Sequence, residues 1–327
     1  MKAASLGQLE DFLGSVRQEY EVVVPVALSD GTVSMGSPDE GKLSLTGRRT
    51  AARPASVFFP HCDRVLIISS SDEMSLPAAP AKPLLVVGLR APDLDCLEFT
   101  DNFFNCGYRD DLYFSRRQSA VVVGLSGRCT EDGGFSRICG GKCDLELVCD
   151  GEVFYCVAYS GRGRKLEEKI EGSLRQGLPV ELTEESESLS VEGEELLRKT
   201  AELLAGRKVP DHYWAELAER CIECTGCNLV CPTCTCFEVY DRDYNGQTVR
   251  SRLWDSCQLS GYAREASGFN PMGAQMSRTR RRLHHKLVDD PRRWGVISCF
   301  LCGRCDEICP TGIGIMAVSR EIVDRFG

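Results

Sequence analysis

The sequence predicts an α+β protein in which a mixed, strand-rich α/β domain precedes a smaller, cysteine-rich domain. Two observations predict this division. The 327 residues are enough for about two domains. Cysteine is unevenly spread, with 8 of the 19 residues before position 211 and 11 after it. The hydrophobic share of 43% and the charged share of 27% are those of an ordinary globular protein.

Charge and hydropathy narrow the class of protein. The formal net charge of −9 argues against general nucleic-acid or anionic-membrane binding. No apolar run approaches the roughly 20 residues of a membrane helix, and positions 1–20 have an amphipathic helical pattern without the apolar core of a signal peptide. We therefore expect a cytoplasmic protein that binds neither membrane nor nucleic acid. In a reducing cytosol, abundant cysteines indicate metal ligation or redox chemistry before disulfides.

The first domain is predicted to span residues 1–177. Alternating segments 144–149 and 152–157 flank Asp150-Gly151, a dipeptide that favours a tight hairpin turn. Apolar runs of strand length predict further strands, and a helical pattern interrupts them. The predicted strands are Glu21–Leu28, Arg64–Ser69, Pro83–Leu89 and Ala120–Leu125, and the predicted helix is Leu94–Phe104.

An acidic stretch separates this domain from the next. Residues 178–210 are rich in glutamate and serine, which is typical of a solvated linker, and they lead into a helix predicted near Glu194–Ala205. The second domain, 211–327, is expected to begin with a short helix that Asp211 caps and that ends near Cys221.

The second domain contains an internal repeat. It reads CIECTGCNLVCP at Cys221–Pro232 and CFLCGRCDEICP at Cys299–Pro310. Both segments follow C-x₂-C-x₂-C-x₃-C-P, the spacing of bacterial-type cubane iron–sulfur ligation. Zinc is the weaker alternative, because its sites use pairs of cysteines rather than a triple with a following C-P. We therefore predict two [4Fe–4S] clusters.

The fourth cysteine of each motif is expected to cross to the other cluster, as in two-cluster ferredoxins. Gly226 and Gly303 are expected to let the backbone approach the cluster and donate N–H groups to its sulfurs. The proline after each fourth ligand ends the run. The predicted ligand sets are Cys221, Cys224, Cys227 and Cys309 for one cluster, and Cys299, Cys302, Cys305 and Cys231 for the other.

The remaining cysteines have two interpretations each. Between the motifs, three of them either contact a cluster or are buried thiols. In the first domain, the others either pack in the core or form a third redox site, and Cys149 and Cys156 are assigned to the hairpin strands. The first group is Cys234, Cys236 and Cys257; the second is Cys96, Cys106, Cys129, Cys139 and Cys143.

A basic segment lies between the two motifs. Residues 278–286, followed by Arg292 and Arg293, are locally basic and would either neutralise anionic clusters, dock an acidic partner or bind nucleic acid. His284 and His285 are interpreted as surface or packing histidines, because neighbours on a helix point in different directions. The sequence has no dinucleotide-binding, P-loop or hydrolase motif, so substrate chemistry is expected on another chain.

The chain resembles the dicluster iron–sulfur subunits of anaerobic sulfite reductase and of cytoplasmic sulfhydrogenase, the NAD(P)-linked nickel–iron hydrogenase, where the similar chain is the beta subunit. Related subunits serve heterodisulfide reductase-like complexes. The resemblance rests on Cys221–Cys236, Arg252–Cys257, Arg278–Lys286 and Cys299–Pro310, with looser matches before them. Where this family often has G-x-R-P-C-D, Pro92 replaces the cysteine.

The resemblance implies an α-helical ferredoxin-type second domain with a long insertion between its motifs. It also implies a complex with a flavin and NAD(P)-binding reductase subunit, together with a catalytic or ferredoxin-like redox subunit. We therefore expect an anaerobic electron-transfer subunit without its own catalytic residues. One alternative is a self-contained reductase with a third cluster or a flavin in the first domain. The other is an iron–sulfur regulator that binds nucleic acid through residues 278–293.

Overall fold

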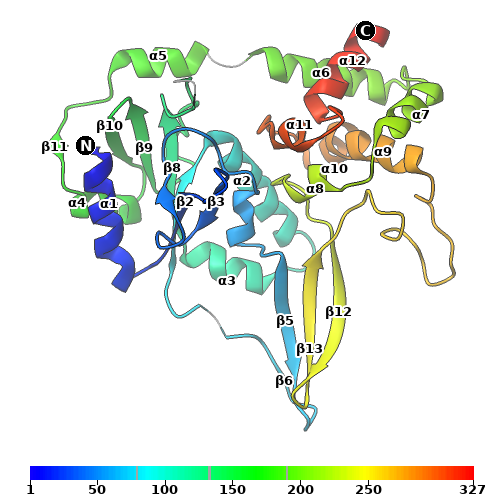
Figure 1. Cartoon of the computed structure of the whole chain (residues 1–327), viewed down its shortest axis with the longest axis horizontal. Coiled ribbons are helices and arrows are strands. Elements are labelled where there is room, and N and C mark those ends of the chain that lie inside the picture. Colours follow the sequence, from blue (N-terminus) through cyan, green and yellow to red (C-terminus); the bar gives the residue numbers. More distant parts are fainter. Residues whose placement is uncertain (79, 132–133, 189–190) are drawn as a thin grey trace. The chain divides into compact units, whose positions relative to one another are not determined.

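The computed structural model describes residues 1–78, 80–131, 134–188 and 191–327. Two compact units divide the chain: the first comprises Met1–Pro60 and Ala78–Leu189, and the second His61–Pro77 and Ser190–Gly327. The first unit is rich in strands and the second is largely helical (Figure 1). This arrangement confirms the predicted mixed α/β class.

A single sheet organises the first unit, with the strand order β11-β1-β10-β9-β8-β7-β2-β3 and with β4 also paired to β2. The neighbours β2–β7, β7–β8 and β8–β9 are parallel, and the outer pairs are antiparallel. The strands are β1 (Lys2–Ser5), β2 (Glu21–Ala27), β3 (Val33–Gly36), β4 (Lys42–Leu43), β7 (Leu84–Leu89), β8 (Val121–Gly127), β9 (Leu145–Asp150), β10 (Val153–Ala158) and β11 (Ser173–Leu174).

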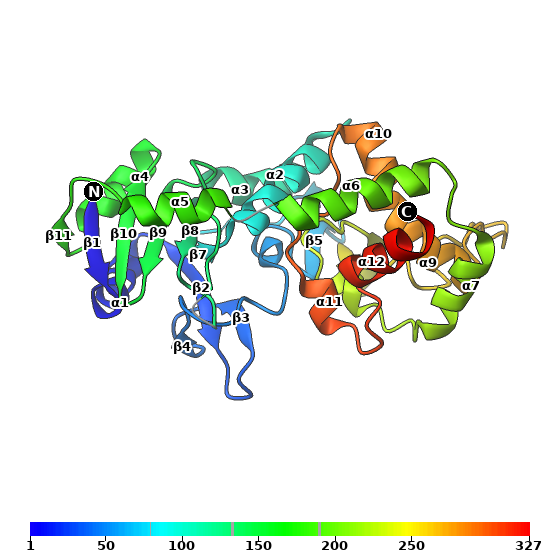
Figure 2. The same ribbon diagram turned by 90° about the horizontal axis from the view of Figure 1, so that it is seen from above.

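The helical segments of this unit connect and cover the strands (Figures 1 and 2). For example, α4 contacts β8, β9 and β10. The segments are α1 (Leu6–Ser15), η1 (Val16–Gln18), η2 (Pro54–Val57), α2 (Ala91–Asn105), α3 (Asp111–Ser119), α4 (Gly161–Lys169) and α5 (Val180–Ser188).

The N-terminal helix is shorter than predicted. Lys2–Ser5 pair with β10 as a strand, and the helix starts only after Ser5, whose side chain caps it reciprocally with Gln8. This capping box satisfies backbone donors that the first turn leaves without partners. The amphipathic pattern therefore described α1 correctly but not the strand before it.

The core of the first unit lies along the central strands. All seven residues of β8 are buried, as expected for a strand inside a partly parallel sheet. The predicted hairpin is confirmed, because β9 and β10 pair across a turn in which Gly151 has φ = 66°. A left-handed residue of this kind suits the right-handed twist of a two-residue hairpin.

The acidic stretch forms two helices where a linker and one helix were expected. In α5, Leu182 is fully buried, Glu185 pairs with Arg128 at 2.9 Å, and the Ser186 hydroxyl accepts a hydrogen bond from the Ile138 N–H at 2.9 Å. The glutamate-rich composition predicted a solvated linker instead of α5, because only a few side chains of this helix pack inward.

The second unit is mainly helical. Helices α6 and α12 lie side by side (Figures 1 and 2), and Trp214, Leu283 and Ile322 are buried in its core. The predicted cap at Asp211 is wrong by one position, because Pro210 occupies the N-cap position of α7 and Asp211 is its first helical residue. The helical segments are α6 (Val191–Ala205), α7 (Asp211–Arg220), α8 (Gly226–Leu229), α9 (Gln275–His284), the π-helical turn η3 (His285–Asp289), α10 (Asp290–Trp294), α11 (Arg304–Ile308) and α12 (Ile315–Phe326).

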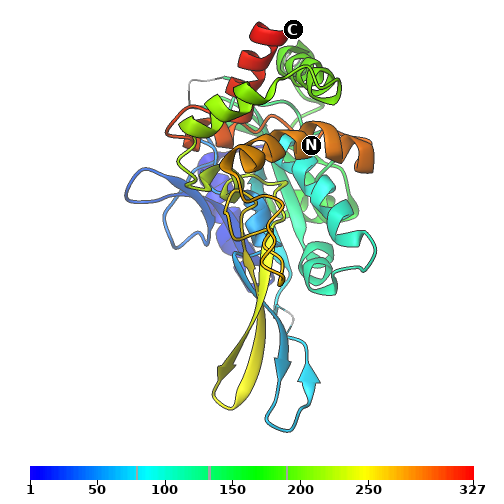
Figure 3. The same cartoon turned by 90° about the vertical axis from the view of Figure 1, so that its right-hand side faces the viewer.

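A second, antiparallel sheet with the order β12-β13-β5-β6 belongs to this unit (Figure 3). Its strands are β5 (Cys62–Ile68), β6 (Met74–Ser75), β12 (Phe237–Tyr244) and β13 (Gln247–Trp254). The strand predicted at Arg64–Ser69 is thus β5, but it pairs with β13 of the second unit rather than with the first sheet. A buried ion pair between Asp63 and Arg252, 2.7 Å apart, joins the two strands.

Candidate functional site

The two cysteine motifs share one backbone conformation. Glu223 and Leu301, each before the second cysteine, have φ of 54° and 58°; Thr225 and Gly303, each after it, have φ of 61° and 71°. Left-handed backbone at non-glycine residues is uncommon, so its recurrence at matching positions extends the repeat from sequence to structure. After the second cysteine of the first motif, the positive φ lies at Thr225, whereas the sequence directed attention to Gly226.

The end of each motif is also repeated. After the third cysteine, a short helix follows in both halves, α8 and α11. The threonine two residues beyond each fourth cysteine brings its hydroxyl to the sulfur, at 3.4 Å for Thr233 and Cys231 and at 3.5 Å for Thr311 and Cys309. The Ile313 N–H also donates to the Cys309 sulfur, at 3.4 Å. Hydrogen bonds to a sulfur stabilise its thiolate form.

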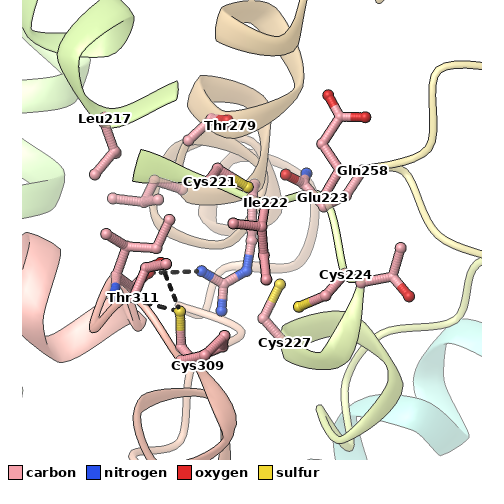
Figure 4. Close-up of a pocket in the computed structure, with 15 residues that line it drawn as sticks. Leu217, Cys221, Ile222, Glu223, Cys224, Cys227, Gln258, Thr279, Cys309 and Thr311 are labelled. Carbon is pink, nitrogen blue, oxygen red and sulfur yellow. Dashed lines mark hydrogen bonds between the residues drawn. The ribbon is translucent and has the colours of Figure 1, made fainter. Parts of the chain in front are cut away.

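One cavity brings together the first predicted ligand set. Cys221, Cys224 and Cys227 line it from the first motif, and Cys309 lines it from the second (Figure 4). The chain separation between Cys227 and Cys309 means that folding of the whole unit creates this arrangement. The crossing of the fourth cysteine to the opposite loop is therefore compatible with the fold.

The second predicted set lies nearby. Cys231, Cys299 and Cys305 are close enough to interact electrostatically with one another, and Cys302 is three positions after Cys299 in the same loop. Cys227 and Cys305 interact as well, although they belong to different sets. The two sets are thus neighbours within the second unit.

The four sulfurs around the cavity match the ligand arrangement of a cluster. Among the described residues, no group of three or more His, Cys, Asp or Glu side chains is placed to hold one metal ion. A cubane is different, because each of its four cysteines binds a different iron and the ligands surround a volume. Four cysteines around one cavity fit that requirement.

Arg282 provides the strongest test of this fit. Its side chain is 7% exposed and lines the same cavity, but its Nε and Nη2 atoms have no hydrogen-bond partner. Its Nη1 donates to the Ile313 carbonyl at 3.5 Å. A buried guanidinium with free donors is costly unless an anion accompanies it, and an iron–sulfur cluster with its thiolates is such an anion.

A second buried cation follows one helical turn later. Lys286, 4% exposed, lies in η3 and donates from Nζ to the Thr233 hydroxyl at 2.7 Å. A π-helical turn shifts the side-chain register and is frequent at functional sites. Arg278, one turn before Arg282, is also buried and hydrogen-bonds to Glu223 and to the Gln258 carbonyl. These three cations of the basic segment face the protein interior.

The pKa shifts describe how the sulfurs and cations interact. Burial raises the pKa of Cys227, and Arg282 opposes that rise. Burial also raises the pKa of Cys299, to about 12. A hydrogen bond from Cys234 lowers the pKa of Cys231, against the effect of burial and with help from Lys286. Burial alone would lower the pKa of Lys286, but Cys231 and Cys234 raise it. The site therefore stabilises negative sulfur beside positive nitrogen.

The cysteines between the motifs are placed around these loops. Cys234 hydrogen-bonds to Cys231. Cys236 precedes β12, Cys257 follows β13, and the two thiols hydrogen-bond to each other. Asn228, next to Cys227, donates to the Cys257 sulfur at 3.1 Å. Sequence reasoning missed Asn228, whose only signal was its position inside the first motif.

The basic segment's two histidines have ordinary partners. The His284 ring is 5.8 Å from the ring of Trp214, and His285 Nε2 is 3.3 Å from Asp290. Burial lowers the pKa of His284. These contacts agree with packing and surface roles.

Cysteines of the first unit lie mainly in and beside its sheet. Those assigned to this unit are buried except Cys106. Cys139 and Cys143 lie over Gly124 of β8, where an added Cβ would come within about 3 Å of both sulfurs. The nearby Glu146 is fully buried and accepts hydrogen bonds from Ser126, from the Cys139 N–H and from Tyr159. These three hydrogen bonds give the buried carboxylate of Glu146 partners on both of its oxygens.

The paired motifs, the shared cavity and its buried cation define an iron–sulfur protein of the electron-transfer class. Residues 220–313 match the family described as 4Fe-4S dicluster domain. Over 299 residues, covering 86% of each protein, the chain is 28% identical to the sulfhydrogenase 2 subunit beta of Pyrococcus furiosus. The chain is a homologue of that subunit, as the resemblance predicted. No solved structure matches the chain.

None of the helices in the part of the chain that the structure describes combines the length and the apolar character that a transmembrane helix requires.

Proposed function

We propose that this protein holds two [4Fe–4S] clusters and carries single electrons between two partner subunits of an oxidoreductase complex. One partner would be a flavin and NAD(P)-binding reductase subunit, and the other a catalytic or ferredoxin-like subunit of hydrogenase, sulfite or sulfur reductase, or heterodisulfide reductase type. The relative's name, a sulfhydrogenase beta subunit, supports both the complex and the hydrogenase type.

The observation that carries the proposal is the cavity lined by Cys221, Cys224, Cys227 and Cys309 with Arg282 beside them. When bound, a [4Fe–4S] cluster accepts and releases one electron at a potential that its surroundings set. The residues supply those surroundings. Thr311 and the Ile313 N–H hydrogen-bond to a ligand sulfur, and Arg282 offers free donors within the cavity.

The second ligand set would be Cys299, Cys302, Cys305 and Cys231, with Lys286 as its neighbouring cation. Because the two sets approach each other at Cys227 and Cys305, the two clusters would be adjacent. The proposed domains are an N-terminal domain (1–177), an acidic segment (178–210) and a dicluster domain (211–327). Strand β5 lies within residues 1–177 but belongs to the second compact unit.

The proposal is tested by purifying the chain anaerobically from its native source with whatever subunits accompany it. We expect a flavoprotein and a second redox subunit to co-purify, and electrons from NAD(P)H to reduce the clusters only when the flavoprotein is present. Isolation of a flavin on this chain alone would contradict the relay and support the self-contained reductase.

A further inference from the structure

Two thiols outside both predicted ligand sets, those of Cys236 and Cys257, lie next to each other beside the β12–β13 hairpin. Cys236 and Cys257 are both partly exposed, and they flank the hairpin formed by β12 and β13. The Asp255 N–H donates to the Cys236 carbonyl at 2.9 Å, which continues the strand pairing to the level of the thiols. Their side chains hydrogen-bond to each other.

Three donors converge on the sulfur of Cys257. Asn228 donates from Nδ2 at 3.1 Å, Gln258 lies with its Nε2 at 3.7 Å, and the Cys236 thiol is the third. Asn228 is 2% exposed, and its Nδ2 also bonds to Ser256 at 3.0 Å. The donors are therefore fixed by the fold and do not depend on a flexible side chain.

This arrangement favours a thiolate at Cys257 and a thiol at Cys236. The hydrogen bond from Cys236 lowers the pKa of Cys257 to about 5, against the effect of burial. The pKa of Cys236 is raised, first by that same hydrogen bond and then by burial. Tyr262 hydrogen-bonds to Cys236, so Tyr262, Cys236 and Cys257 form a line of donors that ends at one sulfur. A thiolate beside a second thiol is the arrangement that thiol–disulfide exchange requires.

We propose that Cys257 and Cys236 form a redox-active thiol pair that reduces the S–S bond of a small-molecule disulfide. The Cys257 thiolate attacks one sulfur of the disulfide, forms a mixed disulfide and releases the first thiolate, which takes a proton from water. The Cys236 sulfur then attacks Cys257, its proton passes to the second leaving thiolate, and a Cys236–Cys257 disulfide remains. The pair has lost two electrons, and the substrate has gained them with two protons.

Return of the pair to its starting state takes two electrons and one proton. Asn228 bonds to Cys257 and directly follows Cys227, a predicted ligand, so the pair adjoins the proposed electron path. In this respect the inference rests on the proposed function, because the reductant would be the chain's own iron–sulfur centre. The exchange half of the reaction needs no such supply and is testable separately.

The first experiment is a single turnover of the intact, anaerobically purified chain with bis(2-hydroxyethyl) disulfide. We expect the wild type to release about two equivalents of 2-mercaptoethanol from this pair, Cys236→Ser to release about one and retain a mixed disulfide on Cys257, and Cys257→Ser to release none. Peptide mass mapping assigns each product to its cysteine. The exposed Cys62 provides the control, because Cys62→Ser should leave the products at Cys236 and Cys257 unchanged.

A second variant tests the role of Cys257 while both cysteines stay in place, so its result does not depend on the folding of the cysteine mutants. Asn228→Asp keeps the size of the side chain but replaces the donor at Cys257 with an acceptor. Its mixed-disulfide formation should be slower by about tenfold or more, since hydrogen bonds to charged groups contribute about 1.5–3 kcal/mol. An unchanged rate would overturn the assignment of Cys257 as the activated thiol.

Iron content and the EPR spectrum are measured on the same samples. Absence of any product at Cys257 in a chain that retains its clusters would overturn this inference and leave the proposed function intact. If the anaerobically purified chain forms the product but holds no iron, the product supports the thiol pair and the missing iron contradicts the two-cluster proposal.

Discussion

The two units both bury cysteines, but they surround them differently. In the first unit, Cys149 and Cys156 lie in the sheet, and burial raises the pKa of each to about 12. In the second unit, the sulfurs of Cys227, Cys231 and Cys305 lie near buried Arg282, and Lys286 is close to Cys231. Lys2 also lowers the pKa of Cys156, but Lys2 is only partly buried. A cysteine beside a cation that is itself buried is therefore the arrangement that suits an anionic ligand.

The largest expected effect tests the crossing of ligands in the second unit. Cys309→Ser and Cys224→Ser come from different motifs but line the same cavity. Each variant should therefore lose the same cluster, with iron falling from about eight to about four atoms per chain and with the same EPR signal missing. Loss of different signals would show that Cys309 belongs to the other cluster.

Cys149→Ser is the matched control from the first unit. Its sulfur is buried in β9, and we expect the iron content of this variant to equal that of the wild type. A loss of iron in Cys149→Ser would show that a cysteine of the first unit also supports a cluster, and it would contradict the comparison.

The next effect concerns a buried carboxylate in the first unit. Glu146→Ala removes the partner of Ser126, of the Cys139 N–H and of Tyr159, and unsatisfied buried donors cost about 1–3 kcal/mol each. We expect the variant to destabilise the first unit by about 2–4 kcal/mol, measured as faster hydrogen exchange in β8 and β9. Glu131→Ala, at an exposed ion pair with Arg48, should leave this exchange unchanged, and the iron content should stay constant in both.

A pH profile distinguishes Cys257 from an ordinary thiol. Its pKa is lowered to about 5 by hydrogen bonds from Cys236 and Asn228 and by nearby His285, so its thiolate is present at neutral pH and is lost as the pH falls through about 5. An ordinary cysteine with a pKa of about 8.5 gains its thiolate only as the pH rises. At pH 7 the thiolate fraction of Cys257 should be about thirtyfold larger, and alkylation by iodoacetamide measures it.

The exposed thiol of Cys62 gives the reference rate in the same sample. Alkylation of Cys257 that increases tenfold per pH unit between about 6 and 8 would contradict the assigned thiolate. A flat rate over that range would support it.

The smallest effect concerns the buried cations. Arg282→Gln removes a positive charge that interacts with sulfurs of both ligand sets, whereas Lys286 interacts with Cys231 and Cys299 of one set only. Since reduction adds negative charge, Arg282→Gln should lower both cluster potentials and Lys286→Gln only one, by on the order of 1–2 kcal/mol of electron affinity. Redox titration followed by EPR measures both shifts.

Arg281 supplies the control for these variants, because it is adjacent to Arg282 but 42% exposed. Arg281→Gln should leave both potentials nearly unchanged, since solvent screens its charge. Equal shifts from Arg281→Gln and Arg282→Gln would show that burial among the sulfurs has no special effect.

Much of the site could be predicted because the cysteine spacing is local. The motifs identified Cys221, Cys224, Cys227 and Cys309, which the fold brings together at one cavity. The roles of Arg282 and Lys286 required tertiary structure, since sequence shows their charge but not their burial. The pairing of β5 with β13 was also missed, because no local pattern connects strands so far apart in the chain.

The central claim is that the second unit binds two clusters while the cysteines of the first unit bind none. The most direct measurement is iron and acid-labile sulfide per chain of anaerobically purified protein, with EPR of the reduced state. The account predicts about eight irons and two interacting signals. About four irons, or about twelve with a signal lost in Cys139→Ser, would contradict it.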